Sequence, residues 1–162
     1  MRVDSQQFAR RVEAMQGALY HVAYGLLLNR ADCADAVQEA LLHAWEKRAS
    51  LREERYFETW LIRILINECY TMLRRRRTTL PLDSLPEPVA PPDADPALHD
   101  AIARLDKKLR LPVVLHYMEG YGLDDIARML RVPTGTIKTR MARARALLRL
   151  QLTDESSEGR HR

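Results

Sequence analysis

The most informative chemical feature of the sequence is a block of positive charge near its C-terminus. Between Ile126 and Thr153 there are seven basic residues and no Asp or Glu. A solvent-exposed helix usually mixes charges of both signs, because ion pairs one turn apart stabilise it. Uncompensated positive charge therefore favours an anionic partner such as nucleic acid over a merely solvated basic helix.

The residues around this block predict a helix-turn-helix. Residues 123–130 form an amphipathic segment, 131–133 form a turn, and Thr134 is a good N-cap for a second helix. One side of the second helix is apolar and is expected to pack on the first: Ile137, Met141, Ala144 and Leu148. The other side suits a DNA major groove, where Arg binds a guanine edge through two hydrogen bonds. The residues expected to contact duplex DNA are Thr136, Lys138, Thr139, Arg140, Ala142, Arg143 and Arg145.

A second polar stripe follows one face of a helix predicted over residues 56–77. Its members recur every three or four residues and combine bases, hydrogen-bonding groups and an aromatic ring: Thr59, Arg63, Asn67, Tyr70 and Arg74. Such a mixture is typical of surfaces that bind single-stranded nucleic acid. The arginine run 74–77 follows and is expected to anchor phosphates. Trp60 has apolar neighbours, which favours the core over a stacking platform, and nothing in the sequence explains Glu68 on the apolar side.

A third candidate surface lies on a helix predicted over residues 34–48. Its exposed face presents one leucine surrounded by carboxylates, made of Asp35, Glu39, Leu42 and Glu46. From the residues alone, an ordinary solvated face and a docking surface for another protein fit this pattern equally well. The residues expected to be buried on the opposite face are Val37, Leu41, Ala44 and Trp45.

These surfaces must be held by helices, and no strand-like alternation is convincing anywhere in the chain. Apolar residues from Phe8 to Leu26 recur at steps of four and three, which predicts one helix. Residues 29–32 then read as a helix stop followed by a new N-cap. Beyond the first half, further helices are predicted at about 97–109, 112–119, 123–130 and 134–151.

A proline-rich segment separates the two helical regions. Residues 78–96 contain six of the eight prolines, several acids and no Lys or Arg. Because proline fixes φ and removes an amide donor, we expect an extended tether here. The predicted fold is therefore all-α, with two small helical domains joined by a linker. Its parts are a first domain over 1–77, the linker over 78–96, a second domain over 97–153 and a disordered tail over 154–162.

The composition of the 162-residue chain predicts a soluble, intracellular protein without catalytic activity. Hydrophobic residues make up 46% of it, enough for real cores, and 26 Lys+Arg against 22 Asp+Glu give a net charge of +4. No apolar signal segment opens the sequence, and no apolar run is long enough to cross a bilayer. Cys33 and Cys69 have no CxxC spacing and are expected to be reduced thiols in helix cores. The histidines are scattered and no catalytic or phosphate-binding motif is present, so we expect no cofactor and no metal.

Several stretches resemble one family. The run PTGTIKTRMARAR, residues 133–145, resembles the GTVKSRxxRAR signature of domain four in bacterial sigma factors of the extracytoplasmic-function (ECF) group, and residues 109–115 and 122–127 also look like that domain. In the first half, DAVQEALLHAW resembles the polymerase-binding helix of sigma domain two, and FETWLIRILIN resembles its F-x-T-W-L-x-R-I-x-x-N signature. Arg131 stands where the family often has Gly, which predicts a left-handed residue. Asp106 stands where a Pro commonly follows Leu.

The resemblance implies a transcription initiation factor that brings RNA polymerase to promoters. Domain four is expected to read the −35 element with Lys138, Thr139, Ala142 and Arg143 facing the bases. Domain two is expected to capture the melted −10 element, with a flipped base held by the loop 51–56. The implied −10 residues are Leu51, Arg52, Tyr56, Thr59, Arg63, Asn67, Tyr70, Arg74 and Arg75. The acidic face is now expected to dock on the polymerase through Asp35, Gln38, Glu39, Leu42 and Glu46.

The implied partners are core RNA polymerase (its β′ clamp helices and β flap), promoter DNA and an anti-sigma factor. The linker is expected to thread the polymerase cleft, where its acids imitate nucleic acid. The protein is expected to be monomeric when free, cytoplasmic, nucleoid-associated when bound to polymerase, and not inserted in a membrane. One alternative is a one-component helix-turn-helix regulator, which needs a sensor or dimerisation domain that the first half does not resemble.

Overall fold

Every regular element in the part of the chain that the structure describes is helical. This computed structural model describes the backbone of residues 3–79 and 95–159, and the side chains of 3–76 and 95–153. The all-α prediction is confirmed for these residues. The chain divides into two compact units, one ending at Glu87 and the other beginning at Pro88. Most of the expected linker, residues 78–96, lies outside the described residues.

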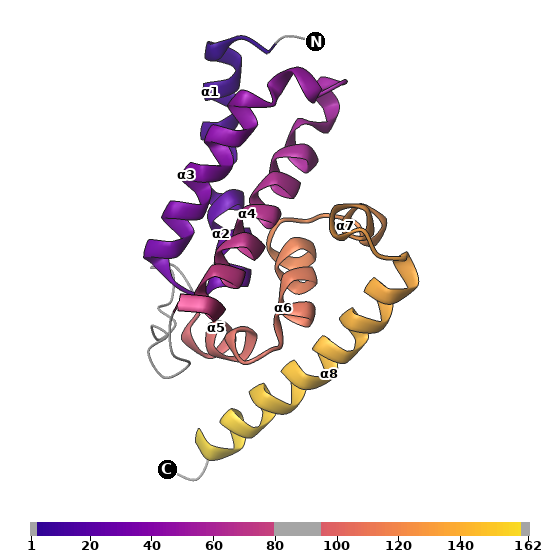
Figure 1. Cartoon of the computed structure of the whole chain (residues 1–162). Coiled ribbons are helices and arrows are strands. Elements are labelled where there is room, and N and C mark those ends of the chain that lie inside the picture. The colour runs from indigo at the N-terminus through magenta and orange to yellow at the C-terminus, as the bar shows by residue number, and fades with distance from the viewer. Residues whose placement is uncertain (1–2, 80–94, 160–162) are drawn as a thin grey trace. The chain divides into compact units, whose positions relative to one another are not determined.

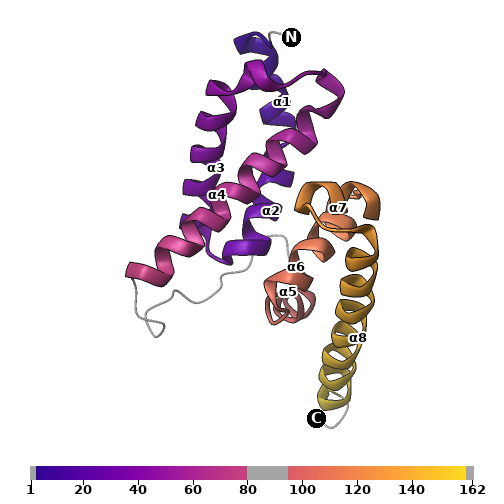
Figure 2. The same ribbon diagram turned by 45° about the vertical axis from the view of Figure 1, so that its right-hand side comes forward.

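The described residues of the first unit, 3–79, form four α-helices (Figure 1): α1 Ser5–Ala14, α2 Gln16–Leu27, α3 Arg30–Glu46 and α4 Phe57–Thr79. Helices α2, α3 and α4 pack against one another, and α3 and α4 run side by side in both views (Figure 2). Two short 3-10 turns connect α3 to α4: η1 Arg48–Ser50 and η2 Glu54–Tyr56. This connection coincides with the loop expected to hold a −10 base.

The prediction of a single helix from Phe8 to Leu26 is wrong, because the chain breaks at Met15. This residue leaves helical geometry with φ −102° and ψ 4°. Gly17 follows closely, and glycine has a low helix propensity, so interrupting the helix here costs little. The predicted apolar face is nevertheless buried on both sides of the break, at Val12, Met15, Leu19, Val22 and Leu26. Periodicity therefore located the buried face correctly but not the one-residue interruption.

Helix α3 begins at Arg30, four residues before the predicted start near residue 34, because the Asn29 side chain caps it by accepting a hydrogen bond from the amide of Asp32 at 3.0 Å. Its fully buried residues are small: Cys33, Ala36, Ala40 and Ala44. Ala44 was predicted to be in the core, but the other three predicted core residues are only partly buried: Val37, Leu41 and Trp45. Small side chains let neighbouring helix backbones approach closely, so the centre of the interface follows the alanine stripe rather than the larger residues beside it.

Helix α4 resolves the anomaly of Glu68. The Glu68 carboxylate contacts the Nδ1 atom of His43 on α3, and both side chains are partly buried. Trp60 is also partly buried, with its ring centroid 5.8 Å from that of Phe57, as expected for a residue at the edge of the core. Cys33 and Cys69 are both buried free thiols. Burial raises the pKa of Cys33 to about 11 and also raises the pKa of Cys69.

The second unit contains α5 Pro96–Ala103, α6 Lys107–Val113, the π-helical turn η4 Val114–Met118, α7 Leu123–Leu130 and α8 Thr134–Gly159. The single helix predicted at 97–109 is wrong, because the chain turns between α5 and α6. Asp106 has an extended ψ of 143° and immediately precedes α6. Arg110, only 5% exposed, donates from Nη1 to the main-chain oxygens of Ala103 and Leu105, at 3.3 and 2.8 Å. A buried guanidinium thus binds carbonyls at the end of α5 that have no helical partner.

The helix predicted at 112–119 also differs from the structure. Helix α6 already contains Pro112 and continues into η4, where the amide of Glu119 donates to the carbonyl of Val114 at 3.2 Å. That five-residue spacing is the π-helical pattern. The prediction of 123–130 for α7 is confirmed. Helix α8 runs to Gly159, so the expected tail at 154–162 begins within a helix, and residues 160–162 lie outside the described part.

Candidate nucleic-acid and partner surfaces

The turn between α7 and α8 is formed by a left-handed residue. Arg131 has φ 57° and ψ 45°, as expected from its position where the family often has Gly. The amide of the next residue, Val132, donates to the carbonyl of Ala127 at 3.0 Å, which closes the end of α7. The chain then enters α8 at Thr134. The two helices therefore meet through a tight turn, as a helix-turn-helix requires.

Over residues 137–145, helix α8 places its large apolar residues and its basic residues on different sides. Ile137, Met141 and Ala144 are each 0% exposed, and α8 packs on both α6 and α7. Most of the predicted duplex-binding residues are exposed: Lys138, Thr139, Ala142, Arg143 and Arg145. Thr136 and Arg140 are partly buried. The exposed side therefore combines small residues with cations, which allows a helix to lie close to base edges.

Two of these predicted residues also have partners within the protein. The hydroxyl of Thr139 donates to the carbonyl of Gly135 at 3.0 Å, and Arg145 Nη1 donates to the hydroxyl of Tyr117 at 3.3 Å. The second contact joins α8 to η4. The Tyr117 hydroxyl is uncharged, so this hydrogen bond orients the Arg145 side chain without neutralising its positive charge.

The polar stripe of the first unit lies along the single continuous helix α4. Asn67 and Arg74 are exposed, whereas Thr59, Arg63 and Tyr70 are partly buried. Hydrogen bonds between neighbouring turns order the C-terminal end of the stripe. Arg74 Nη2 donates to the Thr71 hydroxyl at 3.2 Å, and that hydroxyl donates to the Asn67 carbonyl at 2.9 Å. The structure therefore places the predicted stripe on one helix face.

Two details of the predicted −10 surface need correction. Leu51 is 3% exposed, so its side chain belongs to the core and is not available to a base. The arginine run is also divided. Arg74 and Arg75 are exposed, but Arg76 turns toward α3 and forms an ion pair with Asp32, and burial lowers its pKa. The Arg77 side chain lies outside the described residues.

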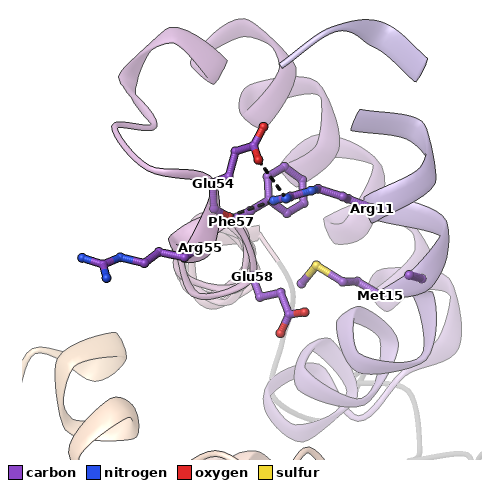
Figure 3. A pocket seen from close by; sticks show the side chains of 7 residues that line it. Arg11, Met15, Glu54, Arg55, Phe57 and Glu58 are labelled. Carbon is purple, nitrogen blue, oxygen red and sulfur yellow. Dashed lines mark hydrogen bonds and ion pairs between the residues drawn. The ribbon is translucent and has the colours of Figure 1, made fainter. Parts of the chain in front are cut away.

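The loop before α4 contains exposed residues and one contact that the sequence did not reveal. Tyr56 is 48% exposed, and the Arg55 guanidinium carbon lies 4.8 Å from its ring centroid. Arg11 of α1 donates from Nη1 to the main-chain oxygen of Glu54 at 2.8 Å. These two residues are 43 positions apart, so no local pattern signals the contact. A cavity of about 340 Å³ lies beside it, lined by Arg11, Ala14, Met15, Glu54, Arg55, Phe57 and Glu58 (Figure 3).

The predicted docking face of α3 is exposed throughout. Asp35, Gln38, Glu39, Leu42 and Glu46 all lie on the surface. Leu42 is 53% exposed, although the opposite side of the same helix is fully buried. Within the described residues, no group of three or more His, Cys, Asp or Glu side chains is arranged to hold a metal ion. No helix in that part of the chain has the length and apolar character needed to cross a membrane.

The fold and these surfaces define a two-unit helical protein whose second unit contains a helix-turn-helix with an exposed basic side. The family model described as Sigma-70 region 2 matches residues 11–79, and that described as Sigma-70, region 4 matches residues 96–148. The chain is 31% identical to the ECF RNA polymerase sigma factor SigW of Bacillus subtilis, over 93% of this chain and 91% of that protein. It is 42% identical to the ECF sigma factor SigM of Mycobacterium tuberculosis, over 72% of this chain and 62% of that protein.

Solved structures agree with these sequence relationships. The sigma factor RpoE, in complex with the anti-sigma factor NepR from Bartonella quintana, has a TM-score of 0.79 at 27% identity, covering 91% of this chain and 98% of that one. CnrH, in complex with the cytosolic domain of CnrY, has a TM-score of 0.71 at 25% identity, covering 93% and 90%. The chain belongs to the ECF group of RNA polymerase sigma factors, which are transcription initiation factors and not enzymes. Because the first half matches a sigma region, a one-component regulator is not favoured.

Proposed function

We propose that this chain directs core RNA polymerase to promoters by reading duplex −35 DNA with residues 97–153 and trapping melted −10 DNA with residues 1–77. Residues 78–96 join the two domains and thread the polymerase cleft. The observation that carries the proposal is the division of the first part of α8, where Ile137, Met141 and Ala144 are fully buried while Lys138 and Arg143 face solvent. The function is binding and positioning, and the polymerase performs the chemistry.

The −35 surface consists of Thr136, Lys138, Thr139, Arg140, Ala142, Arg143 and Arg145. Loss of one base contact costs about 1–3 kcal/mol, so Arg143→Ala is expected to lower −35-dependent transcription by roughly 5- to 150-fold. The matched control is Arg104→Ala, which removes an exposed arginine from the end of α5. Transcription with purified core polymerase measures the effect. Unchanged initiation by the Arg143 variant at a −35-dependent promoter contradicts the assignment.

The −10 surface consists of Arg52, Tyr56, Thr59, Arg63, Asn67, Tyr70, Arg74 and Arg75, with Leu51 supporting the loop from the core. Asn67→Ala and Arg74→Ala are expected to weaken open-complex formation, because each removes an exposed group from α4. A promoter with a pre-melted −10 region isolates single-strand binding from duplex recognition. The proposal fails for this surface if both variants bind the pre-melted promoter as well as the unchanged protein does.

The polymerase-binding surface consists of Asp35, Gln38, Glu39, Leu42 and Glu46. An exposed apolar residue ringed by acids suits a basic partner surface with an apolar centre, and we assign it to the β′ clamp helices. Leu42→Ala is expected to weaken binding to core polymerase about tenfold or more. Leu98→Ala is the control, since Leu98 is similarly exposed at 42%. Fluorescence anisotropy with labelled protein gives both affinities.

Further partners follow from the same proposal. The second unit binds the β flap, and an anti-sigma factor binds the free protein, as the anti-sigma factor NepR binds the sigma factor RpoE in the solved complex. The protein acts in the cytoplasm as a monomer and joins the nucleoid with the polymerase. Light scattering after size-exclusion chromatography tests the monomer, and co-purification from the native host tests the anti-sigma factor.

A further inference from the structure

Arg11 connects α1 to the loop that leads into α4. Its Nη1 donates to the main-chain oxygen of Glu54 at 2.8 Å, and its Nη2 lies 3.5 Å from the Glu54 carboxylate. Its guanidinium carbon lies 5.2 Å from the ring centroid of Phe57. Figure 3 shows the guanidinium at the Phe57 ring, with dashed lines to Glu54. One side chain therefore binds the backbone, a carboxylate and an aromatic ring of the same short segment.

The segment that Arg11 contacts has little support of its own. It is anchored at its ends by Leu51 and Phe57, which are 3% and 1% exposed. Residues 52–56 between these anchors are all exposed. The turn η2 is closed by the amide of Tyr56, which donates to Glu53 at 3.1 Å. The Arg55–Glu53 ion pair and a hydrogen bond from the Thr59 hydroxyl to the Tyr56 carbonyl also lie at or near this turn. The hydrogen bond from Arg11 differs from these because it reaches the middle of the loop from another helix, and it therefore restricts the loop backbone relative to α1.

Charge is the second consequence of the contact. Two carboxylates, Glu54 and Glu58, line the cavity beside Arg11. An unpaired carboxylate next to bound DNA repels the phosphates, and the ion pair with Arg11 neutralises Glu54. Lysine cannot reproduce this arrangement, because only the planar guanidinium donates in two directions while stacking on a ring.

We propose that Arg11 is a positioning residue for −10 recognition, which sets the conformation of residues 52–56 from α1 without touching DNA itself. The inference rests on the proposed function, because it assigns that loop to the melted −10 strand. It adds α1 to the promoter-recognition apparatus. The same contact explains why the cavity wall combines residues from α1 with residues on either side of the start of α4.

The test compares Arg11→Gln and Arg11→Lys in full-length protein with purified core polymerase. The promoter is mapped by transcript-end sequencing and then made with each −10 base replaced in turn. Loss of a charge-assisted hydrogen bond is expected to lower transcription from the unaltered promoter about tenfold with Arg11→Gln. Discrimination against replaced −10 bases should fall about threefold or more, with Arg11→Lys intermediate and core affinity unchanged.

A merely structural role predicts a different pattern, in which all promoters lose activity in proportion and discrimination is retained. That result overturns the inference. If the Arg11→Gln protein does not fold, the folded Arg11→Lys protein provides the test, and unchanged discrimination against replaced −10 bases in it also overturns the inference. Asn67→Ala is tested in parallel. If it impairs −10 binding while both Arg11 variants discriminate normally, the inference fails and the proposed function stands. If Asn67→Ala and Arg74→Ala both have no effect, the assignment of the −10 surface itself fails.

Discussion

Arg131 allows the strain in the helix-turn-helix to be measured. It is left-handed at the end of α7, where glycine is usual. A non-glycine residue pays about 1–2 kcal/mol in this conformation, whereas glycine loses about 0.4–1 kcal/mol through the greater entropy of the unfolded chain. Arg131→Gly is therefore expected to exceed Arg131→Ala in stability by roughly 0.5–1 kcal/mol. The alanine variant is the control, because it loses the same charge but keeps the strain.

The assay is differential scanning calorimetry of the full chain. Both tryptophans, Trp45 and Trp60, lie in the first unit. Tryptophan fluorescence followed over the same temperature range therefore identifies the unfolding of the first unit, and the calorimetric transition without a fluorescence change reports the second unit. For a domain of this size, the expected difference corresponds to a Tm about 2–8 °C higher for the glycine variant than for the alanine variant. Equal melting temperatures refute the strain argument.

Duplex binding separates backbone geometry from charge. Both Arg131 variants remove one cation beside α8, so they should weaken −35 duplex binding to the same extent. A lower affinity for the glycine variant alone contradicts this expectation, since it means that a more flexible turn misplaces α8. Titration at two salt concentrations shows whether the loss is electrostatic.

The remaining predictions concern the two cores. Arg110→Met should destabilise the second unit by about 2–4 kcal/mol in urea denaturation, because it leaves buried carbonyls without their charged donor; an effect below 1 kcal/mol contradicts this role. Ile137→Ala, at a fully buried position, should cost about 2–5 kcal/mol without shifting the tryptophan-monitored transition. Cys33 and Cys69 should react with a thiol reagent at pH 8 only after unfolding. Because burial raises the pKa of Cys33 from 9.0 to about 11, its contribution to stability should be complete below pH 9 and lost as the pH rises to 11.

The sequence predicted best those helices and exposed faces that depend only on the spacing of residues along one helix. The segment 123–130 and the alternation of apolar and basic residues on α8 are local, because residues three and four apart share a helix face whatever surrounds the helix. The left-handed conformation of Arg131 was also predictable, but only from the family resemblance, because Arg131 stands where the family often has Gly. The candidate surfaces on α3 and α4 followed from the same periodicity.

The tertiary structure decided which of these residues are available and what supports them. Leu51 looked like a loop residue but is buried, Arg76 looked like a phosphate anchor but pairs with Asp32, and Glu68 contacts His43. Arg11 shows the reason most clearly, because its partner lies 43 residues away. Periodicity specifies the face of a helix, whereas a contact between distant segments depends on how helices pack, and only the folded chain determines that packing.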